Sequence, residues 1–287
     1  MGHLAEERAR LADLTWESFE VELASPTIGG HVSGVDLTGN VSEESIAEIL
    51  QALYAYKVLF FVDQPLSSEQ HVALAWRFGE LETHPFIPSN TGIPELVRFE
   101  KSADTAGYEN AWHHDVTWRA EPSMGAILHA LAVPPIGGDT LFCDMGAAYD
   151  GLTDEMKQRL DGLVAVHDYA MAFGGAVSPD DADKVRAKYP PVEHPVVHTH
   201  PATGRKLLYL NRLFVSHIVG LPPDESVALI DQVCRRSDVP EYQVRFKWNP
   251  DSVVFWDNRA VQHFACSDYW PEVRVMERAS IVGPRPA

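Results

Sequence analysis

Cysteine, basic charge and long apolar runs are all scarce in this chain of 287 residues. Its three cysteines, Cys143, Cys234 and Cys266, are an odd number at wide spacing, which indicates neither a disulfide framework nor a zinc knuckle. No stretch approaches the roughly 20 apolar residues that span a bilayer, and the N-terminus lacks the apolar core of a signal peptide. We therefore expect a cytoplasmic protein that has no membrane partner.

Basic residues are heavily outnumbered, because 23 lysines and arginines stand against 41 acidic residues for a formal net charge of −18. Such a charge repels nucleic acid and anionic surfaces, although salt screens the repulsion beyond roughly 8 Å. We expect no nucleic-acid partner. An anionic substrate would have to be captured by arginines within a local pocket.

Several common catalytic motifs are also missing from the sequence. It contains no GxGxxG, GxxxxGK[ST] or GxSxG, which removes the motif basis for dinucleotide-binding, P-loop and α/β-hydrolase functions. No internal repeat, low-complexity tract or long Gly/Ser linker marks a domain boundary. We expect one domain over residues 1–287, in which about residues 1–18 form an N-terminal extension that could be flexible.

Four helices are predicted from apolar residues that recur with helical spacing. Their expected starts are Ser42 or Ser45, the capping box of Ser67 and Gln70, a position near Thr153, and a position near Asp224. We expect the second helix to end at Gly79 in a left-handed conformation. The fourth helix is expected to carry Val227, Ile230 and Val233.

Short strands dominate the prediction from about residue 111 onward, where apolar or alternating runs are separated by Pro and Gly. These runs are GAILHALAV, DTLFC, HPVVHTH, KLLYL, SVVFW and VRVMERASIV, and VLFF (residues 58–61) predicts a buried strand upstream. Many short strands with few helices favour a mainly β fold with flanking helices. A jelly-roll or cupin-like barrel fits this pattern better than alternating βαβ units.

The heptapeptide WHHDVTW (residues 112–118) contains the first candidate metal ligands. In a strand, His113 and Asp115 would face one side and His114 the other. A histidine and a carboxylate on one face can occupy adjacent corners of a metal ion, and a distant histidine could complete the set. His263, in WDNRAVQHFA, is the leading candidate for that third ligand. The alternative is a buried histidine that is hydrogen-bonded to an aspartate without any metal.

Several motifs, taken in order, resemble the TauD/TfdA family of Fe(II)- and 2-oxoglutarate-dependent dioxygenases. The motifs are FGELETHP, WHHDVTW, GGDTLFCDMGAAYDGL, HPVVHTHPATGRKLLYLN, and WDNRAVQHFA followed by VRVMERASIVG. The resemblance extends from about residue 20 to the C-terminus. It implies a double-stranded β-helix core and an enzyme that hydroxylates a substrate C–H bond while O2 and 2-oxoglutarate are converted to succinate and CO2.

The resemblance also assigns the metal and cofactor residues of this sequence. His113, Asp115 and His263 would hold Fe(II), which leaves coordination positions open for 2-oxoglutarate and O2. Thr140 and Arg274 would bind the far carboxylate of 2-oxoglutarate, a task that suits the planar fork of arginine.

The expected substrate is a small organic anion, namely a sulfonate, a sulfate ester, an aryloxyalkanoate or a similar carboxylate. The resemblance implies that the substrate contacts His84, Arg278, Phe173 and Phe214. From the residues alone, strand alternation places Arg278 on the same face as Arg274, where two interior arginines need anionic partners. His84 could instead be a surface-loop residue, and the two phenylalanines could belong to the core.

Two departures from taurine dioxygenase alter the predicted substrate pocket. Ile87 stands where that enzyme has a tyrosine, and the position of its asparagine falls on or near Glu109. Four further histidines are expected to be structural or surface residues, namely His167, His194, His198 and His200.

Two other functions are compatible with the same residues. The triad could hold Zn²⁺ and activate water for hydrolysis, or the chain could be a non-catalytic, cupin-like binding protein. Halogenation is disfavoured, because Asp115 occupies the position that halogenases of the family keep small. We also expect a homo-oligomer, either a dimer or a tetramer.

Overall fold

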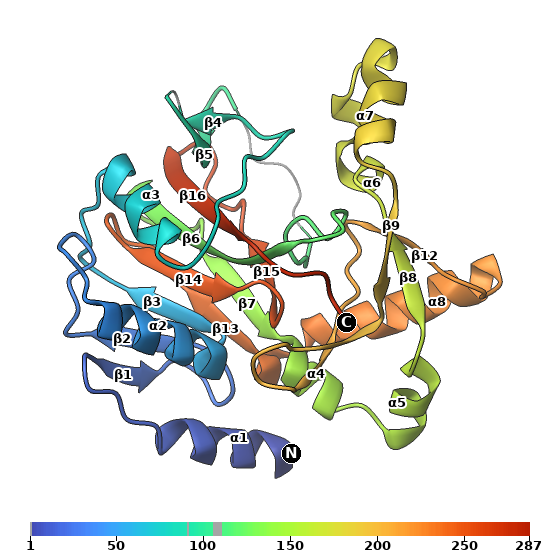
Figure 1. Ribbon diagram of the computed structural model, residues 1–287, viewed down its shortest axis with the longest axis horizontal. Coiled ribbons are helices and arrows are strands. Elements are labelled where there is room, and N and C mark those ends of the chain that lie inside the picture. The colour runs from blue at the N-terminus through green and yellow to red at the C-terminus, as the bar shows by residue number, and fades with distance from the viewer. Residues whose placement is uncertain (1, 91, 106–110) are drawn as a thin grey trace.

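A large sheet forms one half of the core of this computed structural model, which describes residues 2–90, 92–105 and 111–287 (Figure 1). The sheet has eight strands in the order β1-β2-β3-β14-β6-β16-β5-β4. They are β1 (Glu20–Leu23), β2 (Gly30–Ser33), β3 (Val58–Phe61), β4 (Ser89–Asn90), β5 (Ile93–Lys101), β6 (Ser123–Ala132), β14 (Val253–Asp257) and β16 (Arg274–Val282). Neighbouring strands are antiparallel except for β2 and β3.

A second, three-stranded sheet packs against the large one. It consists of β13 (Gln243–Phe246), β7 (Thr140–Asp144) and β15 (Val261–Ala265), in that order. Aromatic side chains fill the space between the two sheets, since Phe60 stacks on Phe246 at 4.4 Å and Phe142 lies 5.9 Å from Trp256. Two mainly antiparallel sheets that bury apolar residues between them form the expected jelly-roll core.

Smaller sheets lie beside this core (Figure 1). One comprises β12 (Val215–Ile218), β8 (Val164–His167) and β9 (Val192–Pro195), and the other pairs β10 (Val197–Thr199) with β11 (Lys206–Leu208). The α-helices are α1 (Gly2–Ala12), α2 (Glu43–Tyr56), α3 (Ser68–Trp76), α4 (Met145–Asp150), α5 (Asp154–Leu160), α6 (Ala170–Phe173), α7 (Ala182–Lys188) and α8 (Pro223–Cys234). Short 3₁₀ helices are η1 (Gly174–Ala176), η2 (Pro179–Asp181), η3 (Arg235–Asp238) and η4 (Pro240–Tyr242). Among the described residues, none of the helices has the length and apolar character that crossing a bilayer requires.

The predicted helix starts are confirmed where a side chain caps the helix. Ser42 accepts a hydrogen bond from the N–H of Ser45 at the start of α2. Ser67 and Gln70 form a complete capping box at the start of α3, and Thr153 caps α5. Local hydrogen-bonding chemistry therefore determines these boundaries.

One detail of the predicted helices is wrong, and one helix buries a different face from the one its apolar residues mark. Helix α3 ends at Trp76, before Gly79, whose φ is +151°. The lack of a side chain at Gly79 permits close packing, because a Cβ there would lie 2.9 Å from the side chain of Ile281. In α8, Val227 is 64% exposed. The buried face instead includes Ser226, whose hydroxyl accepts a hydrogen bond from the N–H of Ile218 and so turns that face toward β12.

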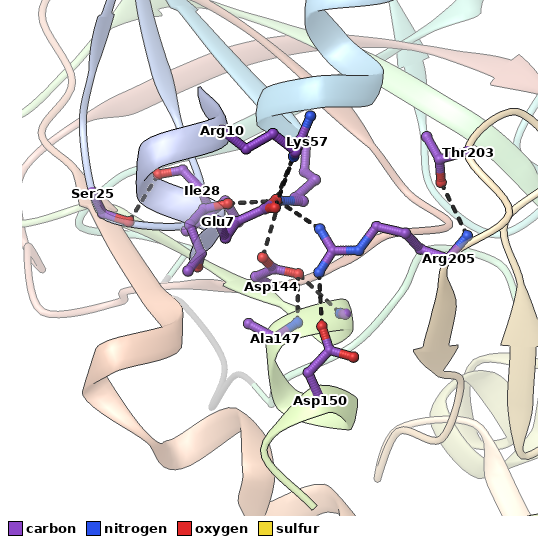
Figure 2. A network of polar contacts seen from close by, with 12 residues as sticks. Glu7, Arg10, Ser25, Ile28, Lys57, Asp144, Ala147, Asp150, Thr203 and Arg205 are labelled. Carbon is purple, nitrogen blue, oxygen red and sulfur yellow. Dashed lines mark hydrogen bonds and ion pairs between the residues drawn. The ribbon is translucent and has the colours of Figure 1, made fainter. Parts of the chain in front are cut away.

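The expected N-terminal extension is instead an anchored helix. Helix α1 buries Leu11 and places Glu7 in a network of charged residues (Figure 2). The Nζ of Lys57 lies 2.6 Å from Glu7 and 3.1 Å from Asp144, and Arg205 also contacts Glu7 at 2.6 Å. Burial alone would raise the pKa of Glu7, but hydrogen bonds from Arg10 and Lys57 hold that pKa well below its ordinary value.

Candidate active site

Three of the predicted site residues meet between the two sheets of the core. His113 and His263 form an isolated antiparallel bridge, in which the N–H of His263 donates to the His113 carbonyl at 2.9 Å and the reverse bond measures 3.2 Å. Asp115 completes the group, and each side chain offers one ligand atom within 4.8 Å of the others. The Nε2 atoms of His113 and His263 lie 3.7 and 3.9 Å from the oxygens of Asp115.

The segment around these ligands is not the strand that we expected. Within residues 112–118, only His113 makes a β-bridge, and its partner is His263 of β15. The chain then turns from Asp115 to Trp118, with a φ of +48° at Val116. The side chain of Asn258 supports this turn, because its Oδ1 accepts from the Asp115 N–H at 2.7 Å and its Nδ2 donates to the Asp115 carbonyl at 3.0 Å. A side-chain amide therefore takes the place of a partner strand at Asp115.

His114 points away from the other two residues, as predicted. Its side chain is fully buried against the ring of Tyr209, 4.7 Å away, and it does not line the cavity that contains His113 and Asp115. The tight turn produces the separation that we expected from strand alternation.

The charge states of the triad suit a metal ion. Burial alone would raise the pKa of Asp115, but the charge of Arg278 outweighs it and holds that pKa well below its usual value. Arg278 Nη1 donates to both carboxylate oxygens, at 3.0 and 2.9 Å. Burial lowers the pKa of His113 and, helped by the nearby His113 ring, lowers that of His263 to about 3. The group therefore offers one carboxylate and two neutral imidazoles.

The hydrogen bonds of the histidines show which nitrogen atoms are available. His113 Nδ1 lies 2.7 Å from the Ala111 carbonyl, which can only accept, so Nδ1 carries the proton and Nε2 keeps a free lone pair. The buried Nδ1 of His263 has no hydrogen-bond partner among the described residues. These ligand atoms fit a divalent transition metal, and a set of two histidines and one carboxylate is typical of Fe(II) sites.

Arg274 and Thr140 form a second group in the same cavity. Thr140 accepts a hydrogen bond from Trp248 Nε1 at 3.0 Å, and the Arg274 guanidinium lies over the Trp248 and Tyr269 rings at 5.8 and 5.9 Å. Arg274 is only 8% exposed, and its Nε and Nη2 have no hydrogen-bond partner within the described parts of the chain. A buried guanidinium with unused donors fits a planar, doubly accepting anion such as a carboxylate.

The other end of the cavity is aromatic. Phe173 lies 5.1 Å from Phe86 and 6.1 Å from Phe214, and His84 lies 5.6 Å from Phe173. His84 Nδ1 accepts the backbone N–H groups of Phe86 and Ile87, at 3.2 and 3.0 Å, which leaves the ring proton on Nε2. Burial, with Arg278 nearby, lowers the pKa of His84 to about 3, so the imidazole is a neutral donor.

One cavity of about 780 Å³ contains all of the predicted site residues, a volume typical of small-molecule sites. Its lining includes His84, His113, Asp115, Thr140, Phe173, Phe214, His263, Arg274 and Arg278. Ile87 also lines it, whereas Glu109 lies outside the described residues. Sequence reasoning missed Phe86 and Trp248. Phe86 could have been found from its position beside His84 in ETHPF, but nothing in the sequence around Trp248 points to Thr140.

Similarity to known proteins agrees with this geometry. Residues 20–280 match the model of the family described as "Taurine catabolism dioxygenase TauD, TfdA family". The chain belongs to the TauD/TfdA dioxygenase family. It is 34% identical to an alkylsulfatase of Acinetobacter baylyi, over 89% of this chain and 82% of that protein.

Two further TauD/TfdA relatives are similar over most of their length. An alpha-ketoglutarate-dependent 2,4-dichlorophenoxyacetate dioxygenase of Cupriavidus pinatubonensis is 33% identical, over 83% of this chain and 88% of that protein. The crystal structure of a taurine dioxygenase from Burkholderia xenovorans superimposes with a TM-score of 0.82 at 36% identity, covering 94% of this chain and 91% of that one. The family relationship therefore extends to the fold of nearly the whole chain.

Proposed function

We propose that this protein is an Fe(II)- and 2-oxoglutarate-dependent dioxygenase that hydroxylates a C–H bond of a small organic anion. The observation that carries the proposal is the meeting of His113, Asp115 and His263 in one cavity with Arg274, whose Nε and Nη2 have no hydrogen-bond partner among the described residues. The relatives support it, since they include an alkylsulfatase and an alpha-ketoglutarate-dependent dioxygenase of an aryloxyacetate.

His113 Nε2, His263 Nε2 and a carboxylate oxygen of Asp115 would hold the iron. When bound, Fe(II) supplies the redox chemistry by which O2 and 2-oxoglutarate are converted to succinate and CO2 while one oxygen atom enters the substrate C–H bond. Asn258 fixes the backbone of Asp115, and Arg278 orients its carboxylate through two hydrogen bonds. Three protein ligands leave the remaining coordination positions to the co-substrates.

Arg274 and Thr140 would bind the carboxylate of 2-oxoglutarate that is remote from the metal. Trp248 donates to the Thr140 oxygen, which leaves the threonine hydroxyl hydrogen free to point at that carboxylate. The rings of Trp248 and Tyr269 hold the guanidinium of Arg274 between them and keep water away from the ion pair. These residues therefore set the orientation of the co-substrate.

The substrate anion would lie at the aromatic end of the cavity. The Nε2–H of His84 can donate a hydrogen bond to the anion. Arg278, which is also hydrogen-bonded to Asp115, supplies a positive charge nearby. Phe86, Phe173 and Phe214 would cover its apolar part and exclude water. The substrate classes that we propose are sulfonates, sulfate esters, aryloxyalkanoates and related carboxylates.

The deciding experiment measures succinate release from 2-oxoglutarate with a panel of these anions, with and without O2. We expect release above the substrate-free background for at least one class, together with O2 consumption. Hydrolysis of an ester without O2 or 2-oxoglutarate would favour the metal-dependent hydrolase instead. Metal-loaded protein that releases no succinate with any anion would favour a non-catalytic binding protein.

We further propose that the enzyme works in the cytoplasm as a homodimer or homotetramer. The three cysteines are free thiols, which suits a reducing compartment. Light scattering coupled to size-exclusion chromatography tests the assembly, and a mass close to 31.9 kDa would contradict it.

A further inference from the structure

Four histidines surround one tyrosine ring behind the metal centre. The ring of Tyr209 lies 4.7 Å from His114, 5.4 Å from His198, 5.8 Å from His194 and 6.0 Å from His167. We call these five residues the histidine cage. Each member is at most 3% exposed, and none of them lines the active-site cavity.

The cage contains an unusual number of buried polar atoms without a hydrogen-bond partner among the described residues. They are Nδ1 and Nε2 of His114, Nε2 of His167, Nδ1 of His194, Nε2 of His198 and Oη of Tyr209. Folded proteins pair nearly all buried polar atoms, either with protein groups or with ordered water. Such a concentration in one cluster therefore points to a bound polar species.

Donors and acceptors are both present in the cage. His194 Nε2 lies 2.9 Å from the carbonyl oxygens of Thr117 and Arg119, which can only accept, so its unpartnered Nδ1 is an acceptor. Tyr209 supplies a hydroxyl donor, since burial raises the pKa of its phenol. A neutral His114 adds one donor and one acceptor.

This mixture suits water better than a metal ion. Water can donate and accept, whereas a cation would use only the lone pairs and leave the tyrosine hydroxyl and the N–H groups unpaired. The four histidines of the cage are also too far apart to share a metal ion, because among the described His, Cys, Asp and Glu residues only His113, Asp115 and His263 form a group of three whose ligand atoms approach within 4.8 Å of one another.

We propose that the histidine cage is an internal hydration site whose ordered water molecules bridge the unpartnered atoms. The cage is joined to the turn that follows Asp115, because His167 Nδ1 lies 2.9 Å from Thr117 Oγ1 and His194 binds the Thr117 carbonyl. Water in the cage therefore helps to hold the turn that carries a metal ligand. The proposal concerns residues outside the cavity and does not depend on the proposed reaction.

A crystal structure that resolves ordered water tests the proposal directly. We expect at least one water molecule within hydrogen-bonding distance of Tyr209 Oη and one cage histidine. An anomalous metal signal in the cage, or a second metal ion per chain by elemental analysis, would overturn it. A dry cage in which the side chains bond to one another would overturn it as well.

The variant Tyr209→Phe gives an independent test in solution, with metal-free protein measured throughout. If water satisfies the hydroxyl, its removal costs a hydrogen bond, and we expect the Tm to fall by roughly 2 °C. If the hydroxyl is buried and dry, the phenylalanine leaves the Tm unchanged or raises it, which would overturn the proposal. Tyr242→Phe is the matched control, because its hydroxyl accepts a direct bond from Arg236 at 2.8 Å and its loss should lower the Tm.

Discussion

The two ends of the active-site cavity are built in different ways. At the end proposed for the metal and co-substrate, Thr140, His263 and Arg274 lie on β7, β15 and β16, where pairing with a neighbouring strand fixes each backbone. At the substrate end, His84 lies outside any regular element and Phe173 ends the four-residue helix α6.

Burial follows the same division for the regular elements, although His84 and Phe214 are themselves buried. Strand residues at the first end are nearly all buried, whereas α6 and α7 contain no buried residue and Met171 beside the cavity is 54% exposed. Strands thus carry most of the residues that we propose to bind the metal and 2-oxoglutarate, and a loop and a short helix carry His84 and Phe173, although Asp115 lies in a turn and Arg278 lies on β16.

The largest effect is expected at the metal end, for Asp115→Ala. Outer-shell partners of a metal ion are worth about 10- to 100-fold in affinity or activity, so loss of a direct ligand should cost more than about 100-fold in both. Iron content and succinate release measure the effect. Asp161→Ala, which removes a carboxylate that is 74% exposed, is the control and should retain both. Full iron occupancy in Asp115→Ala would remove Asp115 from the ligand set.

A smaller but selective effect is expected for Arg274→Gln. Truncating one partner of a buried charge pair costs about 3 kcal/mol, so the KM for 2-oxoglutarate should rise by roughly 100-fold. The KM for the primary substrate should change little, because that substrate contacts the other end. Arg245→Gln, on β13 of the smaller sheet and with a side chain that is 54% exposed, should be neutral. An increase confined to the substrate KM would reverse the assignment of the two ends.

The substrate end should give the opposite selectivity with Phe173→Ala. We expect the substrate KM to rise about tenfold, equivalent to about 1.4 kcal/mol, while the KM for 2-oxoglutarate stays unchanged. Steady-state kinetics with each compound varied in turn separates the two. Phe173→Leu, which keeps an apolar side chain, should recover most of the affinity. Equal losses for both compounds would mean that the two ends are not independent.

The smallest effect is expected for the dependence of the substrate KM on pH. Burial and the charge of Arg278 hold the pKa of His84 at about 3, far below the ordinary value near 6.5. His84 therefore stays neutral at the substrate end, and the substrate KM should vary by less than about twofold between about pH 6 and about pH 8. A steep loss of affinity across that range would show that the imidazolium binds the anion.

The same pKa affects folding in acid. As the pH falls from about 6.5 to 3, His84 takes up a proton in the unfolded chain but not in the folded protein. The contribution of neutral His84 to the free energy of unfolding is therefore complete above that range and is lost as the pH falls through it. Urea midpoints measured against pH, for the wild type and for His84→Gln, should differ in slope there.

Much of the site could be predicted because its residues lie in short motifs that resemble those of one family. The residue types alone made His113, Asp115 and His263 candidate ligands, and the resemblance to the TauD/TfdA family assigned them as the metal triad; interior arginines on one strand indicate anionic partners. Strand runs and helix caps gave the fold class for a similar reason, since capping and alternation are local properties of the chain.

The parts that could not be predicted depend on contacts between distant residues. The turn at Asp115 requires Asn258, and the docking of α1 requires Glu7 to meet Lys57 and Arg205. No local pattern links such residues, so the sequence alone indicated a strand in one case and a loose extension in the other.

The backbone bridge between His113 and His263 has a consequence for how the enzyme acquires its iron. Two reciprocal backbone hydrogen bonds join the chain segments that carry these ligands, so protein atoms alone hold the backbones of His113 and His263 side by side. Most of the conformational entropy of assembling the site is therefore lost during folding rather than during metal uptake. Iron can then dissociate and return without the protein unfolding, and chelation should be reversible.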